Sequence, residues 1–260
     1  MKSEGWQEKL REHYQEKLNE SKRELVKELY HKEIKDLAEQ AENAFNNKQG
    51  SNCIVFTRSK EIASEFLEIL QKEVSTKIHN EEINLVTVTI NPFMVKTEDQ
   101  MINQIYESFN KVTRLPGEIK TLTSKELWEL ILDDTNVALL IIFEELEAYV
   151  TESRQALLYK VFDLLHYVSV RLFFVAVAKN IYIVDSFEKR IKSRYSHRQV
   201  MLYKVDFKLF VKALDQTFYV DVNKLLVGPE DSDSDSHNEE SKHNYNLKEI
   251  NRFVTLLVCT

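Results

Sequence analysis

Glycine, proline and cysteine are scarce in this chain, which has 4 glycines, 3 prolines and 2 cysteines among 260 residues. Few glycines and prolines leave few positions for tight turns, so the sequence predicts long, regular elements. Cys53 and Cys259 lie in apolar runs far apart in the sequence, which argues against a disulfide framework and fits a reducing compartment. The histidines do not cluster with the cysteines at zinc spacing, so no metal site is predicted.

Long apolar runs and a basic charge balance are also missing. No apolar run approaches the roughly 18 residues that a membrane span needs, and the charged first ten residues do not resemble a secretory signal. The net charge of −7 argues against a protein that binds nucleic acid on its own, because such proteins normally carry a basic patch. With 43% apolar content, the chain can bury one sizeable core plus an appendage.

What the chain does contain is a series of short apolar runs separated by helical patterns. Val137–Ile142, six apolar residues without alternation, is typical of a strand that is buried on both faces of a parallel sheet. The other predicted strands cover 52–56, 83–90, 172–178 and 199–205. The predicted helices between and after them cover 62–74, 96–112, 124–132, 154–167, 185–194 and 247–258, with a further helical pattern after Phe207. Strands that alternate with helices predict a parallel sheet with helices on both faces.

The first part of the chain has a different pattern. Residues 6–46 contain no glycine or proline and carry a narrow apolar stripe, which predicts one long or two shorter amphipathic helices. The stripe could dock on the body of the protein or on a partner helix. We therefore divide the chain into a helical extension (1–50), an α/β core (51–205) and a partial helical lid (206–260). Within the lid, the acidic, serine-rich segment 229–246 is expected to be disordered.

Two acids, Glu144 and Glu145, come directly after the strand at Val137–Ile142 and the phenylalanine that follows it. The carboxyl end of a central strand is where open α/β sheets place their ligand crevice. One acid there can hold a metal ion, and the next can orient a water molecule on a nucleotide phosphate. The alternative is a core strand followed by a helix with an acidic first turn, which the helix dipole favours. These residues alone do not decide between the two interpretations.

The turn after the first strand, Thr57–Glu61, reads TRSKE. A nucleotide-binding turn at this place has the pattern GxxxxGK[ST], whose glycines let backbone N–H groups surround the phosphates. This turn has no glycine and is about two residues short of that pattern, so Lys60 alone cannot build the phosphate site. We therefore expect Lys60, Glu144 and Glu145 to form at most a weak, degenerate nucleotide site.

The segment Glu188–Val200, EKRIKSRYSHRQV, is strongly basic and leads into the last predicted strand. One interpretation is a solvated basic helix end. The other is an arginine at a subunit boundary, because a planar guanidinium can bond bidentately to the phosphate of a neighbour and stabilise charge in phosphoryl transfer. The arginines of this segment are Arg190, Arg194 and Arg198.

This segment resembles the corresponding segment of the subunit 4 family of the eukaryotic origin recognition complex, a group of AAA+ initiators. Three further stretches resemble the same family in order: INLVTVTINPF its second strand, IIFEELEAY its strand with the acidic motif, and QALLYKVFDLL the helix that follows. The resemblance covers roughly residues 51–220 and, more loosely, 247–258.

The resemblance implies an AAA+ type αβα sandwich with a five-stranded parallel sheet in the order 5-1-4-3-2, plus a helical lid. It also implies one subunit of a ring-like nuclear assembly that binds replication origins and helps to load the replicative helicase. In the family, the arginine of a Ser-Arg pair reaches the ATP, with its magnesium, that the largest subunit holds. Here that pair is Ser193 and Arg194, while Arg190 and Arg198 are secondary candidates. We expect the edge of the sheet to aim Arg194 outward.

The chain also departs from the family's pattern. The phosphate loop is absent, Glu144 replaces the aspartate that holds the metal, and Ala178 stands where a polar sensor is expected. We therefore predict a non-catalytic subunit that binds no cofactor tightly. The winged-helix domain is missing as well, so we expect the chain to stop inside the lid. Two alternatives stay open: a self-sufficient AAA+ ATPase, and a regulatory scaffold or decoy that lacks DNA contact.

Overall fold

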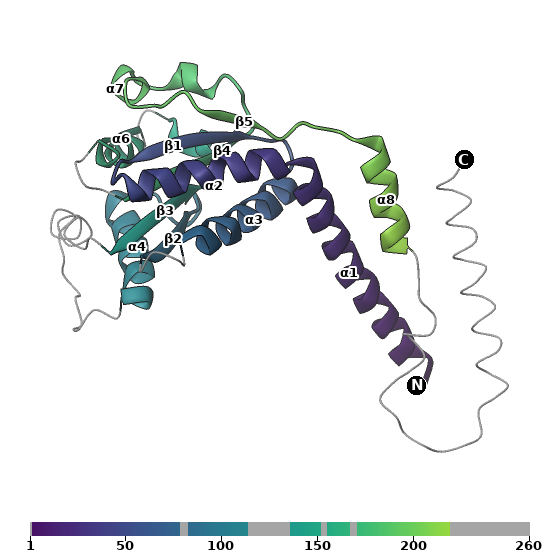
Figure 1. The fold of residues 1–260 in the computed structure, drawn as a ribbon. Helices are drawn as coiled ribbons and strands as arrows, with labels where there is room; N and C mark the ends of the chain where they lie inside the picture. The colour runs from purple at the N-terminus through teal and green to yellow at the C-terminus, as the bar shows by residue number, and fades with distance from the viewer. Residues whose placement is uncertain (1, 79–82, 114–135, 152–154, 167–170, 219–260) are drawn as a thin grey trace. The chain divides into compact units, whose positions relative to one another are not determined.

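A computed structural model describes most of the chain and is drawn in Figure 1. The described residues are 2–78, 83–113, 136–151, 155–166 and 171–218. The chain divides into two compact units, of which one comprises Met1–Leu29 with Val205–Thr260 and the other comprises Tyr30–Lys204. Three of the predicted segments lie outside the described residues, namely the helices at 124–132 and 247–258 and the disordered segment at 229–246.

A five-stranded parallel sheet forms the centre of the unit Tyr30–Lys204. Its strands are β1 (Ser51–Phe56), β2 (Asn84–Ile90), β3 (Val137–Phe143), β4 (Leu172–Ala178) and β5 (Gln199–Met201). They lie in the order β2-β3-β4-β1-β5, and every neighbouring pair is parallel. This is the predicted order 5-1-4-3-2 read from the other edge, so the predicted fold class is confirmed.

Helices cover both faces of the sheet, and the central strands supply side chains to each face because successive residues of a strand point to opposite sides. Leu139, Ile141 and Phe143 of β3 belong to the hydrophobic core that α4 (Glu98–Thr113) and α6 (Gln155–Leu164) complete. On the other face, α2 (His31–Asn46) and α3 (Lys60–Ile78) pack on each other, and α2 also contacts β1 and β4 (Figure 1). Every residue of β3 is buried, as its unbroken apolar run predicted.

The apolar stripe of residues 6–46 forms two helices rather than one. A single residue, Tyr30, separates α1 (Lys2–Leu29) from α2. The apolar face of α2 is buried in the unit Tyr30–Lys204, so this half of the stripe docks on the body of the protein. In the other unit, α1 packs against α8 (Phe207–Phe218), and Lys212 Nζ lies 2.9 Å from Glu28 Oε1. Within the described part of the chain, no helix combines the length and apolarity of a membrane span.

Two predicted elements near the end of the core are wrong in their bounds. The last strand, predicted over 199–205, ends at Met201. Among the described strands it pairs with β1 alone. β1 ends at Phe56, whose carbonyl accepts the last ladder bond from Leu202 N–H at 2.8 Å. The helix predicted over 185–194 is instead a 3₁₀ turn, η2 (Ile183–Ser186), followed by the short helix α7 (Lys189–Lys192).

Candidate functional site

The carboxyl ends of β1, β3 and β4 meet at a pocket of about 250 Å³, which we call the crevice. Lys60, Glu144 and Glu145, the three residues predicted for a nucleotide site, all line it, together with Asn91 and Ala178. The structure therefore brings these three residues together at one edge of the sheet. What they can bind depends on the contacts that their side chains already make.

Both acids of the crevice have protein partners. Glu145 has a left-handed backbone, with φ 49° and ψ 62°, a region that few residues other than glycine adopt. Its carboxylate forms an ion pair with Lys60 and lies 3.8 Å from Lys179 Nζ. The hydrogen bond from Lys60 holds the pKa of the Glu145 carboxyl below its usual value, and the same contact raises the pKa of Lys60. Glu144 accepts a hydrogen bond from Asn91 Nδ2 at 2.6 Å.

The turn between β1 and α3 is short and is closed by side-chain hydroxyl groups. Only Thr57, Arg58 and Ser59 separate the strand from the helix. Ser59 Oγ accepts a hydrogen bond from Ile62 N–H at 3.2 Å, as an N-cap residue does, and Thr57 Oγ1 accepts one from Ser59 N–H at 3.3 Å. The crevice therefore has a capped helix start where a glycine-rich phosphate loop would wrap around its ligand.

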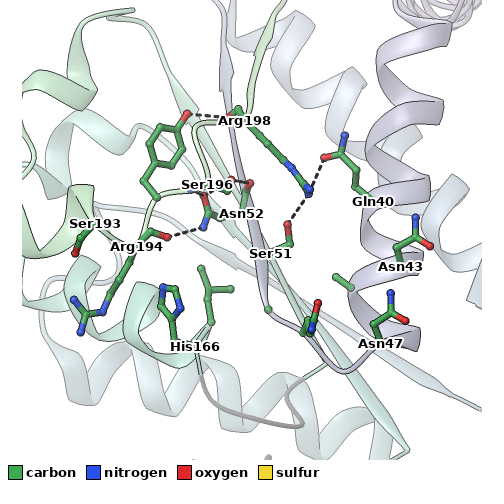
Figure 2. A pocket seen from close by; sticks show the side chains of 15 residues that line it. Gln40, Asn43, Asn47, Ser51, Asn52, His166, Ser193, Arg194, Ser196 and Arg198 are labelled. Atoms are coloured by element: carbon green, nitrogen blue, oxygen red, sulfur yellow. Dashed lines mark hydrogen bonds between the residues drawn. The ribbon is translucent and has the colours of Figure 1, made fainter.

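The basic segment after α7 is fixed to the start of β1 by Asn52, a buried residue with a fractional exposure of 3%. Its Oδ1 atom accepts hydrogen bonds from Ser196 N–H and Oγ–H, and its Nδ2 atom donates to the Arg194 carbonyl at 3.2 Å (Figure 2). Beyond this anchor, Arg198 points toward α2 and donates from Nη1 to Ser51 Oγ at 2.8 Å (Figure 2). Arg198 therefore lies on the side of the segment that faces α2.

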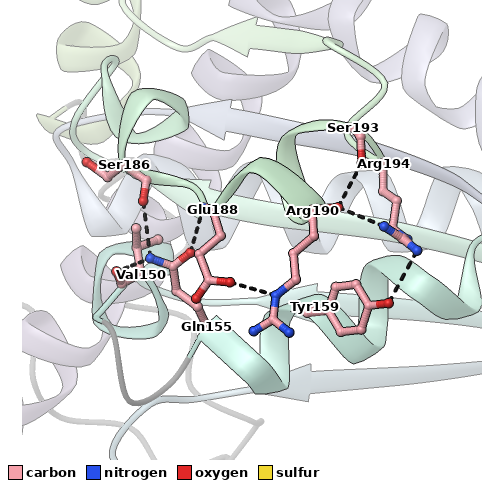
Figure 3. A network of polar contacts seen from close by, with 8 residues as sticks. All are labelled: Val150, Gln155, Tyr159, Ser186, Glu188, Arg190, Ser193 and Arg194. Carbon is pink, nitrogen blue, oxygen red and sulfur yellow. Dashed lines mark hydrogen bonds and ion pairs between the residues drawn. The ribbon is translucent and has the colours of Figure 1, made fainter.

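Arg194 is held against α6 and does not point outward as expected. Its Nε atom donates to Asp163 Oδ1 at 3.0 Å, and its Nη2 atom donates to Tyr159 Oη at 3.3 Å. Its Nη1 atom donates to the Arg190 carbonyl at 2.9 Å (Figure 3). The side chain is 27% exposed. The expectation that the sheet edge aims Arg194 outward is wrong, because Asp163 and Tyr159 of α6 hold its guanidinium.

Arg190 uses the same tyrosine. The guanidinium carbons of Arg190 and Arg194 lie 4.6 and 4.8 Å from the centre of the Tyr159 ring, which is the geometry of a cation–π contact. Arg190 also donates from Nε to Glu188 Oε2 at 2.6 Å (Figure 3). The structure therefore brings two of the three predicted arginines together around one ring and directs Arg198 elsewhere.

Three residues of α6 that organise this segment were not predicted from the sequence: Gln155, Tyr159 and Asp163. Gln155 is buried; it donates from Nε2 to the carbonyls of Val150 and Ser186 at 2.9 and 3.1 Å, and it accepts from Glu188 N–H at 2.8 Å (Figure 3). The three residues are spaced by four, which places them on one ridge of a helix that otherwise buries apolar side chains. That spacing was the signal that could have identified them.

The fold and the crevice define a class of protein. A parallel sheet in this order, with helices on both faces and the candidate nucleotide residues at the carboxyl ends of its strands, is the AAA+ type αβα sandwich. A solved structure of Drosophila ORC bound to AT-rich DNA and Cdc6 contains a chain of the same fold. It matches with a TM-score of 0.59 and 14% identity over 82% of this chain and 35% of that one.

Sequence comparison shows which subunit of the origin recognition complex this chain resembles. The chain is 35% identical over 96 residues to origin recognition complex subunit 4 of Dictyostelium discoideum, over 36% of this chain and 20% of that protein. It is 21% identical over 150 residues to the Saccharomyces cerevisiae protein of the same name, over 58% of this chain and 27% of that protein. The matches thus span about a fifth to a quarter of these relatives. The resemblance to subunit 4 is confirmed, and no family model matches the chain.

Proposed function

We propose that this chain is a non-catalytic subunit of an origin recognition assembly and supplies Arg194 to an ATP site on the neighbouring, largest subunit. The observation that carries the proposal is the arginine segment, which leads into the last strand of an AAA+ sheet in a chain that resembles subunit 4 in sequence. In this role the chain acts in the nucleus and meets origin DNA through the assembled complex, with ATP and magnesium at the interface between subunits.

The contacts of Arg194 hold its guanidinium group in a defined orientation. Asp163, Tyr159 and the Arg190 carbonyl together occupy donors on all three of its nitrogen atoms. A guanidinium has five N–H groups in a fixed plane, so these contacts orient the group and leave it at least one further donor. An arginine that acts on a partner's phosphate gains from such preorganisation, because less side-chain freedom is lost when the contact forms.

The crevice of this chain supports the non-catalytic half of the proposal. Glu145 is engaged by Lys60 and Lys179, and Glu144 is engaged by Asn91. A nucleotide phosphate would have to displace the Glu145 carboxylate from Lys60, without a glycine loop to add backbone donors in compensation. These residues do not fit an ATP–magnesium group well, so we assign this chain no hydrolysis step of its own.

The test is ATP turnover by the assembled complex with wild-type chain, Arg194→Ala, Arg194→Lys and Arg190→Gln, at matched levels of assembly. In-trans arginines contribute about 10³–10⁵ to turnover in well-studied cases, and we expect a loss of at least about tenfold with Arg194→Ala for a slow switch ATPase. Arg194→Lys should not restore turnover, because the ammonium group lacks the planar fork. Normal assembly with wild-type turnover in Arg194→Ala would show that Arg194 has no such role.

The same preparations separate the alternatives. A self-sufficient ATPase would hydrolyse ATP as the single chain and lose that activity with Lys60→Ala. A scaffold or decoy would co-purify with the other subunits and leave turnover unaffected when Arg194 is replaced, but it would make no contact with origin DNA in binding assays. We expect neither result, because the crevice lacks a phosphate loop and the arginine segment is kept.

A further inference from the structure

A second pocket, of about 440 Å³, lies at the amino end of β1 (Figure 2). The last turns of α2, the first residues of β1, the turn after α6 and the segment 193–198 form its walls. β1 runs for six residues, so this pocket and the crevice lie about 17–20 Å apart at opposite ends of the sheet. We call it the amide pocket, because it is lined by Gln40, Asn43, Asn47, Gln49 and Asn52.

The charge of the amide pocket differs from that of the chain. The chain carries 42 aspartates and glutamates among its 260 residues, and yet none of the 15 residues that line this pocket is acidic. Arg194, Arg198 and His166 are among them. A carboxamide can donate two hydrogen bonds without adding charge, so the lining offers many donors around a positive centre.

Arg198 is the arginine whose charge remains available. Arg194 is paired with Asp163, and Arg190 is paired with Glu188. The Arg198 guanidinium donates from Nη1 to two neutral acceptors, Ser51 Oγ at 2.8 Å and Gln40 Oε1 at 3.4 Å. Among the residues that the structure describes, it forms no ion pair. Its other N–H donors therefore remain open to a ligand.

The helix that forms one wall does not cancel this positive charge. α2 ends beside the pocket, where unpaired carbonyl groups would carry the negative end of the helix dipole. Three of the last four carbonyls of α2 already accept hydrogen bonds: those of Asn43, Ala44 and Phe45 accept from the N–H groups of residues 47, 49 and 48 at 3.0, 2.9 and 3.3 Å. Asn43 and Asn47 present their carboxamides on the pocket side of α2 (Figure 2).

We infer that the amide pocket is a binding site for the phosphate chain of a nucleotide, with Arg198 as its principal cationic contact and Asn43 and Asn47 as neutral donors. A phosphate chain is a compact, multiply charged acceptor, and guanidinium and amide N–H groups are its usual partners. DNA fits less well, because duplex binding requires a row of cations along the backbone. This binding is a property of the single chain, so it stands apart from the proposed role of Arg194.

The test is a titration of the full-length, isotope-labelled chain with inorganic pyrophosphate in phosphate-free buffer, followed by amide NMR shifts. We expect saturable shifts at Asn52, Ser196 and Arg198. Arg198→Gln should weaken binding by about tenfold or more, as expected for loss of a hydrogen bond from a charged group. Asn47→Asp, which adds a carboxylate to the lining, should also weaken it. Arg190→Gln is the matched control, because it removes the same charge outside the pocket lining.

Each other outcome contradicts the inference. Shifts confined to Thr57–Lys60, or equal losses in Arg198→Gln and Arg190→Gln, would place pyrophosphate elsewhere or show a general charge effect. Duplex DNA that binds in an Arg198-dependent way, while pyrophosphate causes no shifts, would assign the pocket to nucleic acid. Because Asn47 has no side-chain hydrogen bond among the described residues, Asn47→Asp remains informative even if Arg198→Gln disturbs the fold.

Discussion

Asp163 Oδ1 lies 3.0 Å from both Nε and Nη2 of Arg194. The two residues are 31 positions apart in the sequence, and their contact ties the arginine segment to the last turn of α6. Since Arg194 also lies over the Tyr159 ring, its replacement removes an ion pair and a cation–π contact together. Arg194 therefore contributes to the stability of this fold as well as to any role at a neighbour's site.

The first prediction is a measurable coupling between Asp163 and Arg194. Arg194→Ala should lower the free energy of unfolding by about 1 kcal/mol, because the pair is partly exposed and screened by solvent. The double variant Asp163→Ala with Arg194→Ala should lose less than the sum of the two single variants, by about 0.5 kcal/mol. Urea denaturation measures all three. If the losses of unfolding free energy in the two single variants simply add up in the double variant, the Asp163–Arg194 contact does not form in solution. Arg58→Ala, which changes an arginine on an exposed turn, serves as the control.

The second prediction concerns the crevice. Glu145→Gln removes the carboxylate that engages Lys60 and lies near Lys179, which leaves two ammonium groups for a phosphate. We expect the isolated Glu145→Gln chain to bind ATP about fivefold to tenfold more tightly than the isolated wild-type chain, because the charged donors of Lys60 and Lys179 become free. Calorimetric titration with ATP measures the difference. Asp99→Asn, which changes an exposed acid on α4 outside the crevice lining, is the control and should leave the ATP affinity unchanged. If Glu145→Gln binds ATP no more tightly than wild type, the Glu145 carboxylate does not block the two lysines.

The third prediction is the pH dependence of the same ion pair. The lowered pKa of Glu145 means that its contribution to stability is present above the unfolded pKa of glutamate, about 4.3, and is lost as the pH falls through the folded value. The raised pKa of Lys60 means that its contribution is present below the unfolded pKa of lysine, about 10.4, and is lost at higher pH. The stability difference between wild type and Glu145→Gln should thus stay constant from about pH 5 to pH 10. Denaturation curves at pH 3.5, 7 and 9 check this, and a difference that grows toward low pH contradicts it.

The fourth prediction concerns Gly50, which links α2 to β1. A Cβ atom at this position would lie 2.4 Å from the Leu165 carbonyl oxygen and 2.5 Å from its Cα atom. Both are backbone atoms that cannot swing away, so Gly50→Ala should destabilise the fold by about 1–3 kcal/mol. Gly5→Ala, inside α1, should instead stabilise by up to about 1 kcal/mol through helix propensity. Thermal denaturation measures the melting temperatures of both variants. Equal melting temperatures for Gly50→Ala and Gly5→Ala would show that Gly50 does not pack closely against the Leu165 backbone.

The sequence by itself determined the fold class and the gathering of the crevice residues. The unbroken apolar run at Val137–Ile142 indicates a strand that is buried on both faces, and the alternation of strands with helices indicates that helices cover both faces of the sheet. Once the strands are parallel, their carboxyl ends meet at one edge, so Lys60, Glu144 and Glu145 had to converge. These features follow from patterns a few residues long, and such patterns can be read without knowledge of distant contacts.

The tertiary structure decided which charges pair. Lys60 meets Glu145 across 85 positions, and Arg194 meets Asp163 across 31. The sequence contains several acidic residues that could pair equally well with each of these basic residues, so the local sequence pattern could not identify the partner. The length of β5 was settled in the same way, by where β1 ends. Whether the charge of Arg198 stays unpaired also depends on packing. Asn52 anchors the turn that carries Arg198, and this turn directs the Arg198 side chain toward the amide groups of α2. The side chain therefore points away from the acids that pair with Arg190 and Arg194.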